Sequence, residues 1–252
     1  MSNRTVLIDG DIVAYTAASS VQYSMDWGDG TYTSVGNADE AHMLVGARID
    51  EICNSFGGAQ PIVALSCDGD YFRHGLFAHY KGHRVAMKPV VLKALRELME
   101  LNFQCVKLPR LEADDVLGIL ATGGTLRDPI VYSEDKDLDQ IPGLRAKTCG
   151  VTYRVTEHEA EVNHLILAFA GDPTDGFSGC PRVGPKTARK ILAPYIDEQR
   201  DAAWAWDQIV KRYKKAGLSE EFAVNTARVA RVVRAGEYDA ETTAVTLWEP
   251  PC

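Results

Sequence analysis

Nine carboxylates stand where they could hold metal ions for phosphate chemistry. Asp9, Asp68 and Asp135 each follow a short apolar run that predicts a buried strand. Ligands of open parallel sheets bind beyond the carboxyl ends of the strands, and neighbouring strands lie about 5 Å apart, so these three side chains should converge. Six further acids stand in short motifs along the chain. The expected metal ligands are Asp9, Asp68, Glu112, Asp114, Asp115, Asp135, Asp137, Asp172 and Asp175.

Such a cluster of acids would repel itself unless something offset its charge. Two like charges 4 Å apart in an effective dielectric near 20 repel by about 4 kcal/mol. Hard divalent cations with oxygen ligands are the obvious candidates to offset this. A single Asp at a strand end or helix start is usually a cap, so the indication comes from the number of acids gathered. We therefore predict a two-metal site, which holds the attacking and leaving oxygens of a phosphoryl displacement.

The elements that must position these acids alternate between strand and helix. We expect strands at 4–9, 61–67, 103–108 and 129–133, and helices at 11–19, 37–56, 89–101 and 112–122. A turn-rich segment at 21–36 predicts a hairpin. Further helices are expected at 157–170, 185–193, 201–215 and 219–235. The pattern predicts an α/β core over 1–156 with a mostly parallel central sheet, and a helical lobe over 157–252 packed on the core as one unit.

Composition places the chain among globular proteins with reduced cysteines. Of its 252 residues 46% are apolar, and no apolar run approaches the ~20 residues that span a bilayer. The N-terminus lacks the apolar stretch of a signal peptide, so we expect a cytoplasmic protein. The six scattered cysteines show no zinc spacing. The net charge of −8 conceals a mildly basic body, because 27 Lys and Arg face 26 acids once the nine expected ligands are set aside. No feature demands more than a monomer.

The acidic motifs together resemble the flap endonuclease and 5′→3′ exonuclease family, which includes small T-odd bacteriophage enzymes and the 5′-nuclease domain of DNA polymerase I. The matching segments occur in the family's order: Leu7-Ile8-Asp9-Gly10-Asp11, Ser66-Cys67-Asp68, Leu111-Glu112-Ala113-Asp114-Asp115, Ser133-Glu134-Asp135-Lys136-Asp137 and Gly171-Asp172-Pro173-Thr174-Asp175. The resemblance implies a PIN-like fold and Mg²⁺, with Mn²⁺ as the alternative cation. It also implies two ligand groups, one of Asp9, Asp68, Glu112 and Asp114, the other of Asp115, Asp135, Asp137, Asp172 and Asp175.

The segment after Asp175 is similar to the family's helix–turn–helix element, whose glycine hairpin brings backbone N–H groups to phosphates. Glycine permits close backbone approach, and Pro185 suits the first turn of a helix, whose N-terminus attracts anions. The resemblance also makes 176–190 a candidate site for one K⁺. A plain helical hairpin with surface lysines is the alternative. The expected DNA contacts here are Gly179, Val183, Gly184, Lys186, Thr187, Arg189 and Lys190.

A basic segment at about 71–90 resembles the chain leading into the arch that the family places over its active site. The resemblance implies that Lys81 and Arg84 neutralise the scissile phosphate as charge builds on it. Tyr80 would stack on a terminal base and Arg73 would contact DNA. A solvated basic loop is the alternative. Few residues separate Arg84 from the helix expected near Pro89, so the arch is short.

Three other classes of protein stay open. In a haloacid-dehalogenase phosphatase, whose first motif Asp9 to Val13 satisfies, Asp9 would be a covalent nucleophile, but Asp68 and the hairpin at 176–190 would be unexplained. A PIN-type ribonuclease shares the carboxylates and usually lacks the hairpin. A DNA-binding module would carry a vestigial acidic cluster, yet all nine positions are acids. The favoured function is Mg²⁺-dependent hydrolysis of DNA at a 5′ end or flap, giving 5′-phosphate products. RNA–DNA hybrids are a further candidate substrate.

Overall fold

A six-stranded sheet forms the centre of the first half of the chain. The computed structural model describes residues 4–82 and 88–252. The sheet has the order β5-β4-β1-β6-β7-β8, in which only the pairing of β7 with β8 is antiparallel. Its strands are β1 (Thr5–Asp9), β4 (Gln60–Leu65), β5 (Cys105–Lys107), β6 (Ile130–Tyr132), β7 (Gly143–Thr148) and β8 (Val151–Val155). The mostly parallel α/β architecture is therefore as the sequence predicts.

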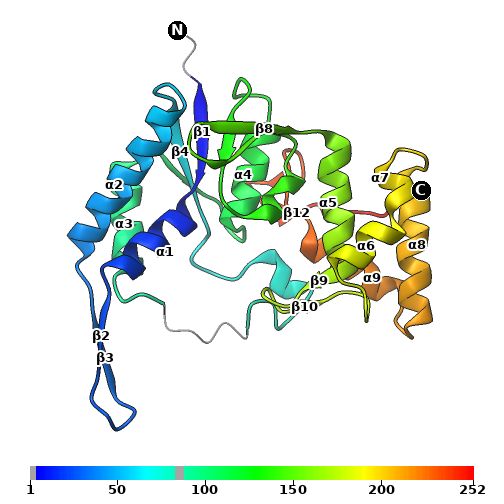
Figure 1. Cartoon of the computed structure of the whole chain (residues 1–252), viewed down its shortest axis with the longest axis horizontal. Helices are drawn as coiled ribbons and strands as arrows, with labels where there is room; N and C mark the ends of the chain where they lie inside the picture. The colour runs from blue at the N-terminus through cyan, green and yellow to red at the C-terminus, as the bar shows by residue number, and fades with distance from the viewer. Residues whose placement is uncertain (1–3, 83–87) are drawn as a thin grey trace.

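Helices cover both faces of this sheet because neighbouring strand residues point to opposite sides. Val6 and Ile8 pack with the helices α1 (Gly10–Ser20), α2 (Ala38–Ser55) and α3 (Leu92–Asn102). Leu7, between them, packs with α4 (Ala113–Thr122) and with the extended chain at Val232 and Val233. Figure 1 shows α1–α3 together at the left of the sheet. Both faces of the central strands are thus buried, as expected of parallel strands.

The remaining helices share a separate apolar core. They are α5 (Glu157–Ala170), α6 (Pro185–Ile191), α7 (Ala193–Ile196), α8 (Ala202–Lys215) and α9 (Glu220–Ala230). Figure 1 places them to the right of the sheet, and Tyr80 from the first half of the chain is buried in their core. Among the described residues, no helix is long and apolar enough to cross a membrane. The division of the chain at 156 and 157 stays a prediction.

In the described part of the chain the hairpin expected at 21–36 is present, whereas three other strand pairs were not expected. The hairpin expected at 21–36 is β2 (Tyr23–Asp26) paired with β3 (Tyr32–Val35), and it extends away from the body in Figure 1. The strands β7 and β8 were not expected, because their sequences mix polar and apolar residues and contain no apolar run. The pairs β9 (Gly171–Asp172) with β10 (Phe177–Ser178), and β11 (Tyr238–Asp239) with β12 (Ala244–Val245), are too short to leave a pattern.

The last helix ends earlier than the sequence predicts. We expected it to reach residue 235, but α9 ends at Ala230 and the chain continues extended. The backbone N–H of Val233 donates to Asp115 at 3.0 Å, and Gly118 lets this strand-like segment approach α4, since a Cβ on Gly118 would lie 2.2 Å from the Val233 carbonyl oxygen. A contact with a distant helix therefore decides where α9 stops.

Candidate active site

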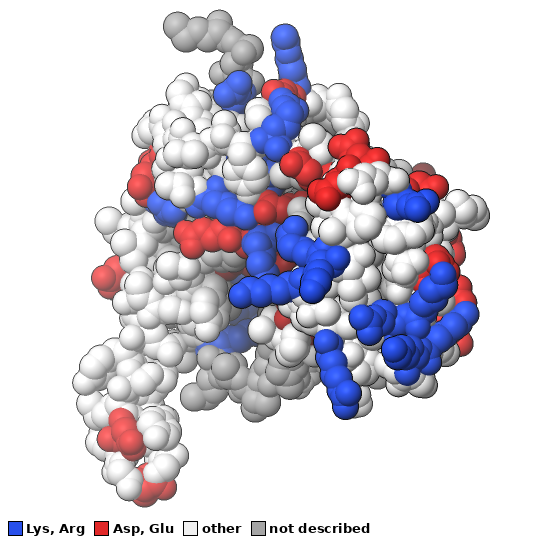
Figure 2. Space-filling view, turned by 45° about the vertical axis from the view of Figure 1, so that its right-hand side comes forward, with Lys and Arg blue, Asp and Glu red and all other residues white. Residues whose placement is uncertain are grey.

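A cleft of about 910 Å³ opens at the carboxyl ends of β1 and β6. Seven of the nine expected ligands line it, together with Asp11: the seven are Asp9, Glu112, Asp114, Asp135, Asp137, Asp172 and Asp175. Figure 2 shows acidic side chains across the middle of one face of the molecule, with Lys and Arg on both sides. Of the three strand-end acids expected to converge, Asp9 and Asp135 line this cleft and Asp68 does not.

Local capping fixes the two acids at the strand ends. Asp9 is the N-cap of α1, where its Oδ1 accepts from the N–H of Ile12 at 3.2 Å. Its Oδ2 accepts from the Ser133 hydroxyl at 3.0 Å, which links the end of β1 to the end of β6. Asp135 caps the short 3₁₀ helix Lys136–Gln140 by accepting from the N–H of Asp137 at 2.8 Å. The capping role and the site role therefore coincide, because a cap uses one oxygen and leaves the carboxylate charge at the cleft.

The electrostatics of the cleft are those of a self-repelling cluster. Burial, and then the charge of Asp11, raises the pKa of Asp9 to about 6. Burial, and then the charge of Asp135, raises the pKa of Asp137 to about 6. Burial raises the pKa of Asp114 well above its usual value, and the charges of Asp9 and Asp135 add to this. The charge of Asp135 acts on all three, so Asp135 lies between the two halves of the cluster.

Glu112 differs from the other acids because cations of the chain already offset its charge. Burial alone would raise its pKa, but the charges of Arg73 and Lys81 lower it below the usual value. The Lys81 Nζ donates to Glu112 at 2.5 Å and lies 3.4 Å from an oxygen of Asp175. Lys81 has a φ of 54° and its N–H donates to the Asp175 carbonyl at 2.8 Å, which fixes its backbone at the rim of the cleft. Its ammonium group therefore stands among the acids.

Two expected ligands lie outside the cleft in this structure. Asp68 is 70% exposed, its Oδ2 accepts from Lys107 at 2.8 Å, and this hydrogen bond lowers its pKa. Asp115 is completely buried and accepts from both terminal nitrogens of Arg73, at 2.6 and 2.8 Å. Asp115 also accepts from the N–H groups of Glu112 and Val233, so its oxygens are engaged inside the protein. The physical reason in both cases is a nearer cation that the sequence pattern did not reveal.

Two expected DNA contacts are buried. Arg73 is 4% exposed and donates to Glu112, to Asp115 and to the carbonyls of Val229 and Arg231. Tyr80 is also 4% exposed, and its hydroxyl lies 2.9 Å from Glu112 and 3.0 Å from Asp175. A side chain held in this way does not offer a face for stacking on a base or a free guanidinium for a phosphate. Both residues line the cleft, where they donate hydrogen bonds to Glu112.

The segment expected to bind DNA lies beside α6. A Cβ on Gly179 would lie 2.2 Å from the carbonyl carbon of Ala170, so this glycine allows two backbones to meet. Gly184 is the N-cap of α6 and Pro185 is its first residue, whereas Val183 is buried. Exposed around this loop are Lys186, Thr187, Arg189 and Lys190. Arg84, the second expected catalytic cation, lies outside the described residues.

Sequence reasoning missed several side chains that line the cleft. One face of α1 lines the cleft through Ile12, Tyr15 and Thr16. Ile12 follows Asp9 by three residues, and Tyr15 and Thr16 follow Ile12 by three and four, so helical spacing was the available signal. Lys88, Arg96 and Lys136 also line it. Arg96 donates to the Ser66 carbonyl, and its Nε lies 3.5 Å from an oxygen of Asp11. No sequence signal marked Arg96, because its position on α3 matters only once the fold is known.

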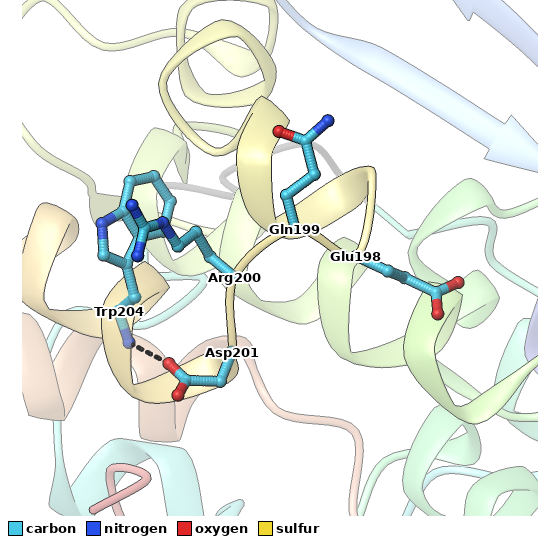
Figure 3. A pocket seen from close by; sticks show the side chains of 5 residues that line it. All are labelled: Glu198, Gln199, Arg200, Asp201 and Trp204. Carbon is cyan, nitrogen blue, oxygen red and sulfur yellow. Dashed lines mark hydrogen bonds between the residues drawn. The ribbon is translucent and has the colours of Figure 1, made fainter.

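A second cavity of about 500 Å³, between α7 and α8, is unlike an active site. It is lined by Glu198, Gln199, Arg200, Asp201 and Trp204. Figure 3 shows Arg200 beside Trp204, whereas Glu198 and Gln199 point away from them. Asp201 accepts from the N–H of Trp204 at 2.8 Å as the N-cap of α8. These side chains do not converge on a common point, so the acidic cleft remains the candidate site.

The acidic cleft fits divalent cations by its donor chemistry. All of the expected ligands that line it are carboxylates, the ligands preferred by hard cations, and burial with neighbouring acidic charges raises the pKa of Asp9, Asp114 and Asp137. Within residues 4–82 and 88–252, no three His, Cys, Asp or Glu side chains are arranged to hold a metal ion as they stand. Binding would therefore require the carboxylates to turn inward and Lys81 to leave Glu112.

The chain is similar to known exonucleases in sequence and in fold. The family model described as the 5′-3′ exonuclease, N-terminal resolvase-like domain, matches residues 4–164. The chain is 26% identical to the exonuclease of Escherichia phage T7, over 97% of this chain and 93% of that one. It is 33% identical to a 5′-3′ exonuclease of Mycobacterium tuberculosis, over 68% and 67% of the two chains. A structure of the T5 5′-exonuclease with bound zinc shares the fold, with a TM-score of 0.65 and 18% identity over 90% of this chain and 89% of that one.

Proposed function

The chain belongs to the 5′-3′ exonuclease family, and we propose that it hydrolyses DNA phosphodiesters at or near a 5′ end with two divalent cations held in its acidic cleft. The observation that carries this proposal is the gathering of seven expected ligands in one cleft, three of them with raised pKa values. A fold that keeps such repulsion needs cations to offset it. The proposed products carry a 5′-phosphate.

The acids divide into two overlapping groups that suit two cations. Besides burial, the charges of Asp9 and Asp135 raise the pKa of Asp114, and the charges of Asp135, Asp172 and Asp175 raise the pKa of Asp137. Glu112 belongs with the first group because its charge also raises the pKa of Asp114. A pair of divalent cations there would supply Lewis-acid stabilisation of the attacking and leaving oxygens. The chain's own contribution is to hold the acids apart at fixed positions, through the caps at Asp9 and Asp135.

The proposed role of Lys81 follows from its place at the rim of the cleft. Its ammonium group is held by Glu112 and Asp175, which keep its pKa above the usual value although burial alone would lower it. With its acidic partners neutralised by bound cations, Lys81 would be free to contact a phosphate oxygen of the substrate. A cation aimed at charge that develops in the transition state contributes a few kcal/mol. Arg84 is proposed to act beside it.

The proposed DNA-binding element is the hairpin at 176–190 with α6. Four exposed side chains there can contact phosphates: Lys186, Thr187, Arg189 and Lys190. The backbone around Gly179 and Gly184 is proposed to approach the duplex closely and to hold the expected K⁺. We infer that this element binds the duplex part of the substrate while the cleft receives the strand that is cut.

The polarity of cleavage tests the proposed function. Duplex and flap DNA labelled at the 5′ end or at the 3′ end are incubated with the protein in Mg²⁺. We expect early release of short 5′-labelled products, whose ends carry 5′-phosphate, and slow loss of the 3′ label. Hydrolysis of a small phosphomonoester without cleavage of DNA would instead favour a phosphatase.

Replacing Lys81 by Met should slow cleavage more than it weakens binding. Because the proposed contact forms in the transition state, kcat should fall by about 10- to 100-fold, with KM within about threefold. Lys186→Ala is the matched control on the hairpin, and it should raise KM while kcat stays near that of the wild type. Steady-state kinetics on one 5′-flap substrate measure both. Equal losses in kcat and KM in the two variants would contradict this division of roles.

Divalent cations should stabilise the protein in the absence of DNA. Binding at about 100 times the dissociation constant adds about 2.7 kcal/mol to the free energy of unfolding, which for a chain of this size corresponds to a rise in melting temperature of several degrees. The measurement is a thermal melt in EDTA and in millimolar Mg²⁺ at constant ionic strength. Glu134→Gln, at an exposed position of the motif that is not an expected ligand, should keep the full shift. An identical melting temperature in EDTA and Mg²⁺ would count against cation binding in the cleft.

A further inference from the structure

The C-terminal end of α8 carries four exposed cations, of which two form ion pairs with acids of the chain. Lys211, Arg212, Lys214 and Lys215 are all exposed. Lys211 pairs with Asp207, and Lys214 pairs with Glu220 at 2.8 Å. Arg212 and Lys215 form no ion pair with any residue of the described ranges 4–82 and 88–252. They are three positions apart on the helix, so they share one face.

This end of α8 lies beside the loop that precedes α6. The hydroxyl of Tyr213 donates to the carbonyl of Ala168 at 2.8 Å, and the N–H of Cys180 donates to the next carbonyl, that of Phe169, at 2.9 Å. Two neighbouring carbonyls at the end of α5 therefore hold α8 and the loop side by side. Consistent with this, burial raises the pKa of the Cys180 thiol while the charge of Arg212 opposes the rise.

The loop itself adds one more exposed cation. Arg182 is exposed, has a φ of 64° and forms no ion pair with the described part of the chain. It lies two residues from Cys180 and four residues before Lys186 of the proposed DNA-binding hairpin. Figure 2 shows Lys and Arg gathered at the lower right, over the helical part of the molecule. On a chain with a net charge of −8, such a local excess of positive charge indicates a negatively charged partner.

We propose that Arg182, Arg212 and Lys215, here called the α8 patch, bind the phosphate backbone of duplex DNA beyond the contacts made by the hairpin at 176–190. This inference rests on the proposed function, because it assumes that DNA is the substrate. The patch lies outside the cleft and has no base-reading element, so it adds affinity without sequence preference. Cations in the last turn of a helix also interact favourably with the helix dipole, which would account for their presence without DNA.

The two explanations differ in the salt dependence of DNA binding. Each phosphate contact adds about 0.9 to the slope of log K against log salt. The double variant Arg212→Ala/Lys215→Ala should therefore lower that slope by about 2. The control double variant Lys211→Ala/Lys214→Ala removes the same charge from the same helix, but its lysines are paired with acids, so the slope should change by less than half as much. Fluorescence anisotropy with a labelled flap duplex in EDTA measures binding without cleavage.

Kinetics in Mg²⁺ provide the second measurement. The α8 patch variant should raise KM and leave kcat within about twofold of the wild type, because its residues do not touch the cleaved phosphodiester. A thermal melt checks that both double variants stay folded. A slope and KM equal to those of the wild type, or to those of the control variant, would overturn the inference while leaving the proposed function intact. A wild-type protein that neither binds nor cuts DNA would overturn both.

Discussion

Replacing Asp114 by Asn should abolish cleavage and, at the same time, raise the melting temperature of the metal-free protein. Asp114 lines the cleft, and burial together with the charges of Asp9 and Asp135 raises its pKa well above the usual value. Its charged form therefore destabilises the folded state at neutral pH. An amide of the same shape removes this repulsion, and about 1 kcal/mol gained would raise the melting temperature by about 2–4 °C.

The sign of this effect depends on pH. A carboxyl group whose pKa is higher in the folded than in the unfolded state binds more protons when folded, so the protein loses stability as pH rises above the unfolded pKa, about 4. The gain in Asp114→Asn should therefore be present at pH 7 and shrink near pH 4, where the wild-type group is protonated in both states. Thermal melts in EDTA at the two pH values measure it.

The loss of activity in the same variant has a separate cause. Asn offers one neutral oxygen where a cation requires a charged one, so several kcal/mol of transition-state stabilisation should disappear. That corresponds to a fall in the cleavage rate of about 1,000-fold. Glu134→Gln, an exposed acid of the neighbouring motif, should change neither the rate nor the melting temperature. A lower melting temperature for Asp114→Asn than for the wild type in EDTA would show that the charge of Asp114 does not destabilise the folded state.

Replacing Arg73 by Met should be among the most destabilising single changes in the chain. The guanidinium donates to two acids, Glu112 and Asp115, and to the carbonyls of Val229 and Arg231. Both acids are buried, so removing Arg73 leaves two charges without their main partner. Breaking a buried ion pair in this way typically costs about 3–5 kcal/mol. Urea unfolding should show a loss of that size.

A matched control separates this effect from the loss of a positive charge in general. Arg127 is exposed, and Arg127→Met should change the free energy of unfolding by less than about 0.5 kcal/mol. Asp115→Asn combined with Arg73→Met should be less destabilising than the sum of the two single changes, because they remove one shared interaction. If Arg73→Met were as stable as the wild type and only weakened DNA binding, Arg73 would be a DNA contact, as its place in the basic segment at first indicated.

The sequence predicted the part of the site that depends on local order along the chain. Asp9 ends β1 and Asp135 lies three residues after β6, and the rule that ligands bind beyond the ends of parallel strands brings the two acids together. Within the motif at 111–115, Glu112 and Asp115 both accept hydrogen bonds from Arg73, whereas Glu112 and Asp114 line the cleft. The spacing of these three acids along the chain did not indicate which of them would face the interior of the protein.

The parts that sequence reasoning missed depend on partners far along the chain. Arg73 and Tyr80 look like exposed residues of a basic segment, yet they are buried because Glu112, 39 and 32 residues away, accepts hydrogen bonds from both. Asp68 lies outside the cleft because Lys107 on β5 stands closer to it. The α8 patch depends on two neighbouring carbonyls of α5 that hold α8 beside a loop. No periodicity or motif within one segment contains such information.

The most direct test of the central claim is the single-turnover cleavage of 5′-labelled flap DNA across a Mg²⁺ titration, for the wild type and for Asp135→Ala. Asp135 is the residue whose charge acts on both halves of the acidic cluster. We expect cleavage that rises with Mg²⁺, stops in EDTA and is lost in the variant at every Mg²⁺ concentration. Cleavage that persists in EDTA, or that survives the loss of Asp135, would contradict a metal-dependent nuclease centre in this cleft.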